Sequence, residues 1–215
     1  MIDSKQIPNV VTMSRLLFAV GAFWFMGEVR ELDELPAEGS RAAFWAFWLF
    51  LVASISDFLD GWLARKYNWL TAFGRVADPV VDKVLTLGSL TYLAASPQYR
   101  MDGDFFEVVP VWAVVLMLAR EFLVTALRGL VESRGQSFPA DGYGKLKLII
   151  QVVYIAIPLG VAGGIPAFLH LDFLVYTREP HLYAVLFWAM VGLTLLSGLN
   201  YIVRGARMLN AASSE

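Results

Sequence analysis

Four aspartates in two apolar stretches are the residues best suited to chemistry. Asp57 and Asp60 lie three positions apart, and Asp78 and Asp82 lie four positions apart. On a helix, each spacing places both carboxylates on one face. A charge inside an apolar membrane helix costs about 2.5–3.5 kcal/mol on insertion scales, so such residues usually mark a functional site. These four side chains are therefore the candidate reactive centre.

A metal centre is the chemistry that converging carboxylates favour. The connection between the two pairs, residues 65–74, is short enough to make their helices antiparallel neighbours. Four carboxylates brought together repel one another, so protons or divalent cations must neutralise them. Oxygen ligands alone suit Mg²⁺, Mn²⁺ or Ca²⁺. The alternative is structural: the aspartates cap helices or pair with Arg65, Arg75 and Lys83.

The composition indicates that membrane-spanning helices position these residues. Of the 215 residues, 58% are apolar and 17% are charged, whereas soluble domains are about 45–50% apolar and about 25% charged. A membrane helix needs about 20 mostly apolar residues. Six stretches meet this requirement, roughly residues 9–27, 43–64, 76–95, 108–130, 146–163 and 182–203. The sequence predicts an all-α fold, a single domain over residues 1–215 with six transmembrane helices.

Composition also excludes several classes of function. The chain has no cysteine, which rules out disulfide scaffolds, thiolate metal sites and cysteine nucleophiles. The formal net charge is −2, so the chain has no basic footprint for nucleic acid. These exclusions leave oxygen-ligand chemistry at a membrane as the main possibility.

Basic residues are distributed unevenly between the predicted loops. The first, third and fifth loops contain Arg30, Arg41, Arg100 and Arg178 among many acidic residues. The other side holds Lys5, Arg65, Lys66, Arg75, Arg128, Arg134, Lys145, Lys147, Arg204 and Arg207. Positive charge gathers on the cytoplasmic side of membrane proteins. This bias predicts that both termini are cytoplasmic and that the four aspartates lie near the cytoplasmic helix ends.

The spacing of the reactive centre resembles the signature of the CDP-alcohol phosphatidyltransferases. The pattern Asp57-x2-Asp60-Gly61-x2-Ala64-Arg65-x8-Gly74-x3-Asp78-x3-Asp82 matches it at all eight positions. Other segments resemble the phosphatidylglycerophosphate synthases of this family, namely IPNVVTMSR at 7–15, AREF at 119–122, ALR at 126–128 and GKLK at 144–147. The resemblance spans roughly residues 7–150.

This resemblance implies an enzyme of phospholipid biosynthesis. Such an enzyme is a homodimer in a bacterial-type inner membrane, with a di-metal site that opens to the cytoplasm. Glycerol 3-phosphate displaces CMP from CDP-diacylglycerol and gives phosphatidylglycerol phosphate. By the same resemblance, Asp57, Asp60 and Asp78 hold two Mg²⁺ or Mn²⁺ ions, and Asp82 takes the hydroxyl proton and also contacts a metal. The alternative for Asp82 is a fourth plain ligand.

A subsite for the CDP-lipid is implied in the same way. Its residues are Asn9, Thr12, Arg15, Gly61, Ala64, Arg65 and Gly74. The three small residues make room for cytidine, or equally allow close helix packing. The three first-helix residues share one side and could line the diphosphate, although Asn9 serves equally well as a helix cap. Arg65 either orients the diphosphate or is a charge that sets the topology.

An acceptor that carries its own phosphate requires a second basic subsite. The candidates are Arg120, Arg128, Lys145 and Lys147. Lys147 lies two residues after Lys145 and points almost the other way on a helix, and Lys145 is the favoured one of the two. The alternatives are that Arg120 pairs with Glu121, and that Arg128 and Lys145 only set the topology. The last two predicted helices offer only hydrophobicity.

Two other functions compete with this one. The first is the same reaction with inositol phosphate or serine as the acceptor. The basic set favours a phosphorylated acceptor over serine, and only the whole-segment resemblance favours glycerol phosphate over inositol phosphate. The second is a cation transporter that uses intramembrane carboxylates. Transporters place such sites near the midplane and often contain internal repeats, whereas these acids cluster at one side and no repeat is visible.

Overall fold

The computed structural model describes residues 7–29, 40–67, 72–96, 109–136, 138, 142–168 and 180–211. The side chains of 7–11, 57–67, 72–79, 143, 166–167, 180–182 and 210–211 lie outside this description. The described elements are α1 (Ile7–Gly27), α2 (Arg41–Tyr67), α3 (Ala72–Ala95), α4 (Val111–Ser133), α5 (Gly142–Ala162), α6 (Ile165–Phe168) and α8 (Pro180–Ala211). Every regular element in these ranges is therefore an α-helix.

Proline and glycine mark several helix ends. Pro110 precedes α4 with an extended backbone (φ −66°, ψ 139°), and its ring fixes φ while removing an N–H that would lack a helical partner. Gly135 follows α4 with a φ of 75°, which glycine adopts without steric cost. Its N–H donates to the Glu132 carbonyl at 3.0 Å. Gly164, with a φ of 68°, ends α5 in the same way.

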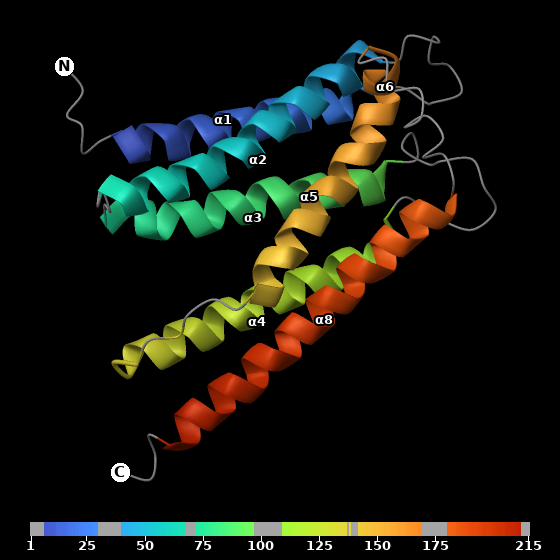
Figure 1. Ribbon diagram of the computed structural model, residues 1–215. Coiled ribbons are helices and arrows are strands. Elements are labelled where there is room, and N and C mark those ends of the chain that lie inside the picture. Colours follow the sequence, from blue (N-terminus) through green and yellow to red (C-terminus); the bar gives the residue numbers. More distant parts are fainter. Residues whose placement is uncertain are drawn as a thin grey trace.

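Consecutive long helices run in opposite directions (Figure 1). Helices α1, α2 and α3 pack together, and α4 packs along α8. Helix α5 crosses between the two groups and contacts α2, α3 and α8, while α3 also contacts α4. The start of α1, the adjoining ends of α2 and α3, and the end of α8 consequently lie on one side of the molecule.

A close helix crossing joins α1 to α3. A Cβ on Gly88 of α3 would meet the ring of Phe23 in α1, so any larger residue at this crossing requires the ring to move. The Phe23 ring stacks on Tyr92 with 5.4 Å between ring centroids. Small residues that let helix backbones approach are typical of helices that pack within lipid.

Large apolar side chains also cover the outside of the described bundle. Leu17, Trp24 and Phe122 are about 70% exposed, and an apolar surface of this kind suits contact with lipid. Gly144–Ala162 and Tyr183–Leu209 are long and apolar enough to cross a membrane, judged by length and composition. Shorter apolar helices occupy Thr12–Gly27 and Arg41–Ser56. All four segments were found within the described part of the chain.

A helix is present at each of the six predicted positions. The expected connection at 65–74 is wrong in extent, because α2 continues to Tyr67 and α3 begins at Ala72. Arg65 and Gly74 therefore lie in helices, since polar residues extend both helices beyond their apolar segments. Six membrane crossings and the side on which the termini lie stay predictions. The acidic loops at 30–39, 97–108 and 169–179 lie outside the described residues.

Candidate active site

The four signature aspartates lie on two neighbouring helices. Asp57 and Asp60 belong to α2, Asp78 and Asp82 belong to α3, and the two helices are in contact. At a rise of 1.5 Å per residue, both pairs lie about 9–15 Å along their helices from the adjoining ends. The backbone thus places the pairs at matching depths. Only the side chain of Asp82 is described, and it is half-buried.

This backbone register fits the donor set of a divalent-cation site. Carboxylates at i, i+3 on one helix and at i, i+4 on its antiparallel neighbour provide oxygen ligands from two sides. Because three of the four side chains lie outside the description, their convergence stays a prediction. Among the described side chains, no three acidic or histidine groups gather closely enough to hold a metal ion.

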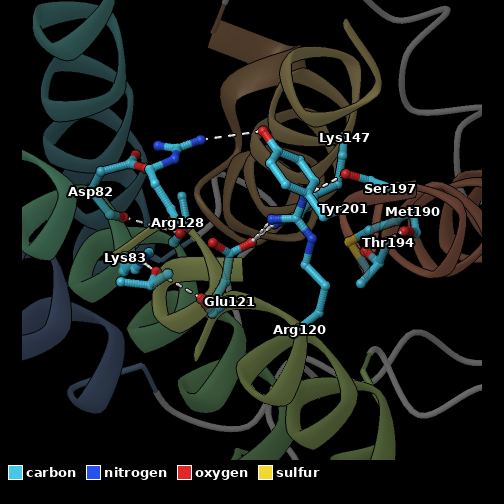
Figure 2. Close-up of polar contacts among 12 residues, drawn as sticks. Asp82, Lys83, Arg120, Glu121, Arg128, Lys147, Met190, Thr194, Ser197 and Tyr201 are labelled. Carbon is cyan, nitrogen blue, oxygen red and sulfur yellow. Dashed lines mark hydrogen bonds and ion pairs between the residues drawn. The ribbon is translucent and has the colours of Figure 1, made fainter. Parts of the chain in front are cut away.

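Asp82 lies on the part of α3 that adjoins α4 and α5. Its backbone carbonyl accepts a hydrogen bond of 3.0 Å from Thr86 Oγ1, one turn further along α3. The adjacent Lys83 donates through Nζ to Thr125 Oγ1 and so ties α3 to α4. The ammonium of Lys147 on α5 lies near enough for its charge to attract the Asp82 carboxylate. The end of the signature therefore adjoins the basic residues of the later helices (Figure 2).

Glu121 is the centre of a charged cluster between α4 and α5. Its Oε1 accepts from Arg120 Nη1 at 2.7 Å and from Lys147 Nζ at 2.5 Å. The three side chains are 6–14% exposed. Figure 2 shows all three converging. With two cations and one anion the cluster has a net positive charge, and low surrounding polarity strengthens its attraction for a further anion.

The two α4 arginines also contact α8. Arg120 Nη2 donates to Ser197 Oγ, and Arg128 Nη2 donates to Tyr201 Oη at 3.2 Å. Both Ser197 and Tyr201 are buried. The expectation that the last helices contribute only hydrophobicity is therefore wrong for α8. Serine and tyrosine one turn apart in an apolar helix were the sequence signal that could have revealed this contact.

The two candidate lysines of α5 have different environments. Lys145 is exposed, whereas Lys147 is only 5% exposed and joins the Glu121 cluster. The predicted divergence of these side chains is thus confirmed. The preference for Lys145 over Lys147 as a phosphate ligand stays untested, and the geometry places Lys147 with Arg120. The predicted pairing of Arg120 with Glu121 is also present.

The predicted CDP-lipid residues are described only in part. Thr12 and Arg15 of α1 are buried, at 2% and 1% exposure. Burial of a cationic side chain is costly unless the charge is paired, so the burial of Arg15 is unusual for its residue type. Asn9 of α1, Gly61, Ala64 and Arg65 of α2, and Gly74 of α3 lie where side chains are not described. Their roles stay predictions.

The described geometry can therefore bind an anion beside a carboxylate. Asp82 provides a carboxylate at one edge, and the α4 and α5 cations provide hydrogen-bond donors for phosphate oxygens. Two guanidinium groups and an ammonium are the donors that proteins use for phosphate.

Comparisons with known proteins agree with the signature. The CDP-alcohol phosphatidyltransferase family matches residues 5–196. A CDP-diacylglycerol–glycerol-3-phosphate 3-phosphatidyltransferase of Rickettsia typhi is 31% identical over 92% of this chain and 95% of its own length. The Bacillus subtilis protein of the same description is 30% identical over 70% of this chain and 74% of its own length.

A third relative covers still more of the chain. A probable phosphatidylglycerophosphate synthase of Mycobacterium tuberculosis is 33% identical over 94% of this chain and 82% of its own length. The family match includes α1 to α5 and much of α8, so it contains both the signature and the basic cluster. This chain belongs to the CDP-alcohol phosphatidyltransferase family.

Proposed function

We propose that this enzyme transfers the phosphatidyl group of CDP-diacylglycerol to glycerol 3-phosphate. The products are phosphatidylglycerol phosphate and CMP. The observation that carries the proposal is the buried cation cluster of Arg120, Lys147 and Glu121 beside Asp82. It offers a phosphate site next to the last residue of the phosphatidyltransferase signature. The names of relatives that match most of the chain support the same acceptor.

The reaction needs a base for the acceptor hydroxyl. The hydroxyl oxygen forms a bond to the lipid-linked phosphorus, the bond from that phosphorus to the CMP oxygen breaks, and the hydroxyl proton leaves. Asp82 is the proposed proton acceptor. The charge of Lys147 attracts the Asp82 carboxylate, and a base within hydrogen-bond reach typically contributes about 10²–10⁴-fold.

Two divalent cations are proposed for the aspartate pairs. Asp57, Asp60 and Asp78, together with Asp82, would hold Mg²⁺ or Mn²⁺, because hard cations prefer carboxylate oxygens. When bound, the cations would neutralise the diphosphate and stabilise the departing CMP phosphate. The matching depths of the two pairs on α2 and α3 support this assignment.

The remaining assignments concern the two substrates. Arg120, Arg128, Lys145 and Lys147 are proposed for the acceptor phosphate. Asn9, Thr12, Arg15, Gly61, Ala64, Arg65 and Gly74 are proposed for the CDP-lipid. The buried position of Arg15 on α1 supports a role in binding the diphosphate, because a buried guanidinium is well suited to bidentate contact with phosphate.

The proposed setting is a bacterial-type inner membrane. All six long helices would cross it, with both termini and the active site at the cytoplasmic face, and two copies would form a homodimer. The apolar outer surface and the antiparallel order of the helices support a multi-pass arrangement.

One assay tests this function. The purified protein in detergent, with CDP-diacylglycerol and Mg²⁺, should release CMP when glycerol 3-phosphate is added. A panel with inositol phosphate, serine and glycerol identifies the acceptor, because the matching acceptor alone should drive rapid release. Excess chelator should abolish the activity, and Mg²⁺ or Mn²⁺ should restore it. Full activity in excess chelator contradicts the metal proposal. If none of the acceptors in the panel drives CMP release, the transferase proposal is contradicted and the transporter alternative is open again.

A further inference from the structure

Helix α8 presents a small polar patch to the arginines of α4. Ser197, Gly198 and Tyr201 form this patch, which we name the α8 cradle. Ser197 is fully buried and Tyr201 is 3% exposed. The surrounding segment, Tyr183–Leu209, is apolar enough to cross a membrane. Polar groups buried in such a segment are expensive, so they usually serve a function or a specific contact.

Arg120 contacts all three members of the α8 cradle. Its Nη2 donates to Ser197 Oγ. Its guanidinium carbon lies 5.6 Å from the centroid of the Tyr201 ring. A Cβ on Gly198 would lie 3.2 Å from Arg120 Cγ, so the glycine leaves the space that the arginine stem fills. Together, these contacts fix the side chain along its length.

Arg128 contacts the same tyrosine. Its Nη2 donates to Tyr201 Oη at 3.2 Å, and its guanidinium carbon lies 6.0 Å from the ring centroid. Phe138 packs edge-on against the ring, with 5.3 Å between centroids, and so restrains the tyrosine from another side. One ring therefore sets the positions of two arginines that lie two turns apart on α4.

The partners supplied by α8 are neutral. A serine hydroxyl, a phenol and an aromatic face hold a guanidinium without cancelling its charge. Arg120 also pairs with the Glu121 carboxylate, but Lys147 shares that carboxylate, so the cluster keeps a net positive charge. The Nε atoms of Arg120 and Arg128 are buried and have no hydrogen-bond partner among the described residues. Buried donors of this kind suit a ligand that accepts hydrogen bonds, and two cations suit an anion.

We propose that the α8 cradle prearranges Arg120 and Arg128 as the binding pair for the acceptor's phosphate. Tyr201 is then a positioning residue that acts through the arginines and selects phosphorylated over unphosphorylated alcohols. This inference rests on the proposed function, because it assumes that the acceptor brings the phosphate. Prearranged side chains lose less freedom on binding, which is why loss of the tyrosine weakens phosphate binding even though the arginines remain.

The test compares Tyr201→Phe and Tyr201→Leu with the parent protein in the CMP-release assay. Tyr201→Phe removes the hydroxyl and keeps the ring, and it should raise the KM for glycerol 3-phosphate about tenfold. Tyr201→Leu removes both and should raise it about thirtyfold or more. The KM for CDP-diacylglycerol should stay within about twofold of the parent value. The kcat should change less than the acceptor KM, because the lost contacts bind the acceptor equally well in the ground state and in the transition state.

Tyr183 offers a matched control on the same helix. It is also buried, and its hydroxyl donates to the Tyr154 carbonyl at 3.2 Å, away from the arginines. Tyr183→Phe should therefore leave the acceptor KM unchanged. Equal changes in both KM values for Tyr201→Phe, or an acceptor KM that does not change, would overturn the proposal.

A binding measurement separates this inference from the proposed function. Calorimetry with inorganic phosphate on the detergent-purified protein requires no turnover. Tyr201→Leu should weaken phosphate binding at least tenfold. If the parent protein releases no CMP with glycerol 3-phosphate, the proposed function fails, and the phosphate measurement alone then decides the inference. Phosphate binding that is unchanged in both Tyr201 variants overturns it.

Discussion

Asp82 lies where two helices of the basic cluster approach α3. Thr86 bonds to its backbone carbonyl, and Lys147 attracts its carboxylate from α5. A base needs a fixed position relative to the hydroxyl that it deprotonates, and geometry precedes acidity in identifying one. A fourth metal ligand would occupy the same place, so kinetics must distinguish the two roles.

Replacement of Asp82 by asparagine tests its role. If Asp82 accepts the hydroxyl proton, Asp82→Asn should lower kcat by about 10²–10⁴-fold and leave both KM values near those of the parent. A titration with Mg²⁺ provides the decisive measurement. Activity that returns towards the parent value at high Mg²⁺ would identify Asp82 as mainly a ligand, with another group or water as the base.

Glu121 holds two cations that would otherwise repel each other. Arg120 and Lys147 both bond to the same carboxylate oxygen. Removing one partner of a buried ion pair is more costly than removing the pair, because an uncompensated charge remains in the interior. The cluster should therefore respond to single and double substitutions in different ways.

A double-mutant cycle measures this coupling. Glu121→Gln should lower the free energy of unfolding in detergent by about 3 kcal/mol, because Lys147 then lacks its acidic partner. Adding Lys147→Gln should cost less than the sum of the two single changes. Glu132→Gln, an exposed charge change on the same helix, should stay within about 0.5 kcal/mol of the parent. Additive losses for the pair would contradict the coupling.

At the level of single residues, the sequence indicates which residues are candidates for the site better than it indicates where their side chains point. The Arg120–Glu121 pair, which the sequence offered as the alternative role of Arg120, is present, whereas the metal-binding role of the signature aspartates stays a prediction. The burial of Lys147 did not follow from the sequence, because α5 is apolar on most of its surface and its pattern does not show which side faces α4. Tyr201 was missed because its role depends on a contact between α4 and α8, which are distant in the sequence.

The helices themselves were predictable because each contains a long apolar run. The residues at which the helices end were harder to predict. Helix α8 continues to Ala211 rather than residue 203, and α2 continues to Tyr67 rather than residue 64. Arginine, lysine and alanine are good helix formers, so the helix persists after the apolar run stops. Packing between elements depended on small residues whose partners the sequence does not specify.

A glycine at the end of α5 tests such packing. A Cβ on Gly163 would lie 2.7 Å from the backbone nitrogen of Phe44 in α2. Backbone atoms yield less than side chains, so Gly163→Ala should destabilise the protein by about 1–3 kcal/mol, seen as a lower Tm in detergent. Gly192 in α8 meets nothing within 4 Å, and Gly192→Ala should be neutral or slightly stabilising. Equal Tm values for both variants would contradict the close crossing.

Across the whole molecule, the direction of the chain alternates from one long helix to the next. Consecutive long helices are antiparallel, and the adjoining ends of α2 and α3 lie on the same side as the end of α4 (Figure 1). The charge bias of the loops predicts that this side is cytoplasmic. The substrates agree with this orientation, because a water-soluble phosphorylated alcohol made in the cell reaches the site from that side.

The orientation can be tested with cysteines, because the chain contains none. Glu28 directly follows α1, Glu132 lies in the last turn of α4, and both are exposed. If α1 starts in the cytoplasm and α4 ends there, these glutamates lie on opposite sides of the membrane. In intact cells, a membrane-impermeant maleimide should label Glu28→Cys and leave Glu132→Cys unlabelled, whereas permeabilised cells should show both. If only Glu132→Cys is labelled in intact cells, the orientation is the reverse of the one predicted. If both variants are labelled in intact cells, the ends of α1 and α4 lie on the same side, which contradicts the alternating arrangement of membrane crossings.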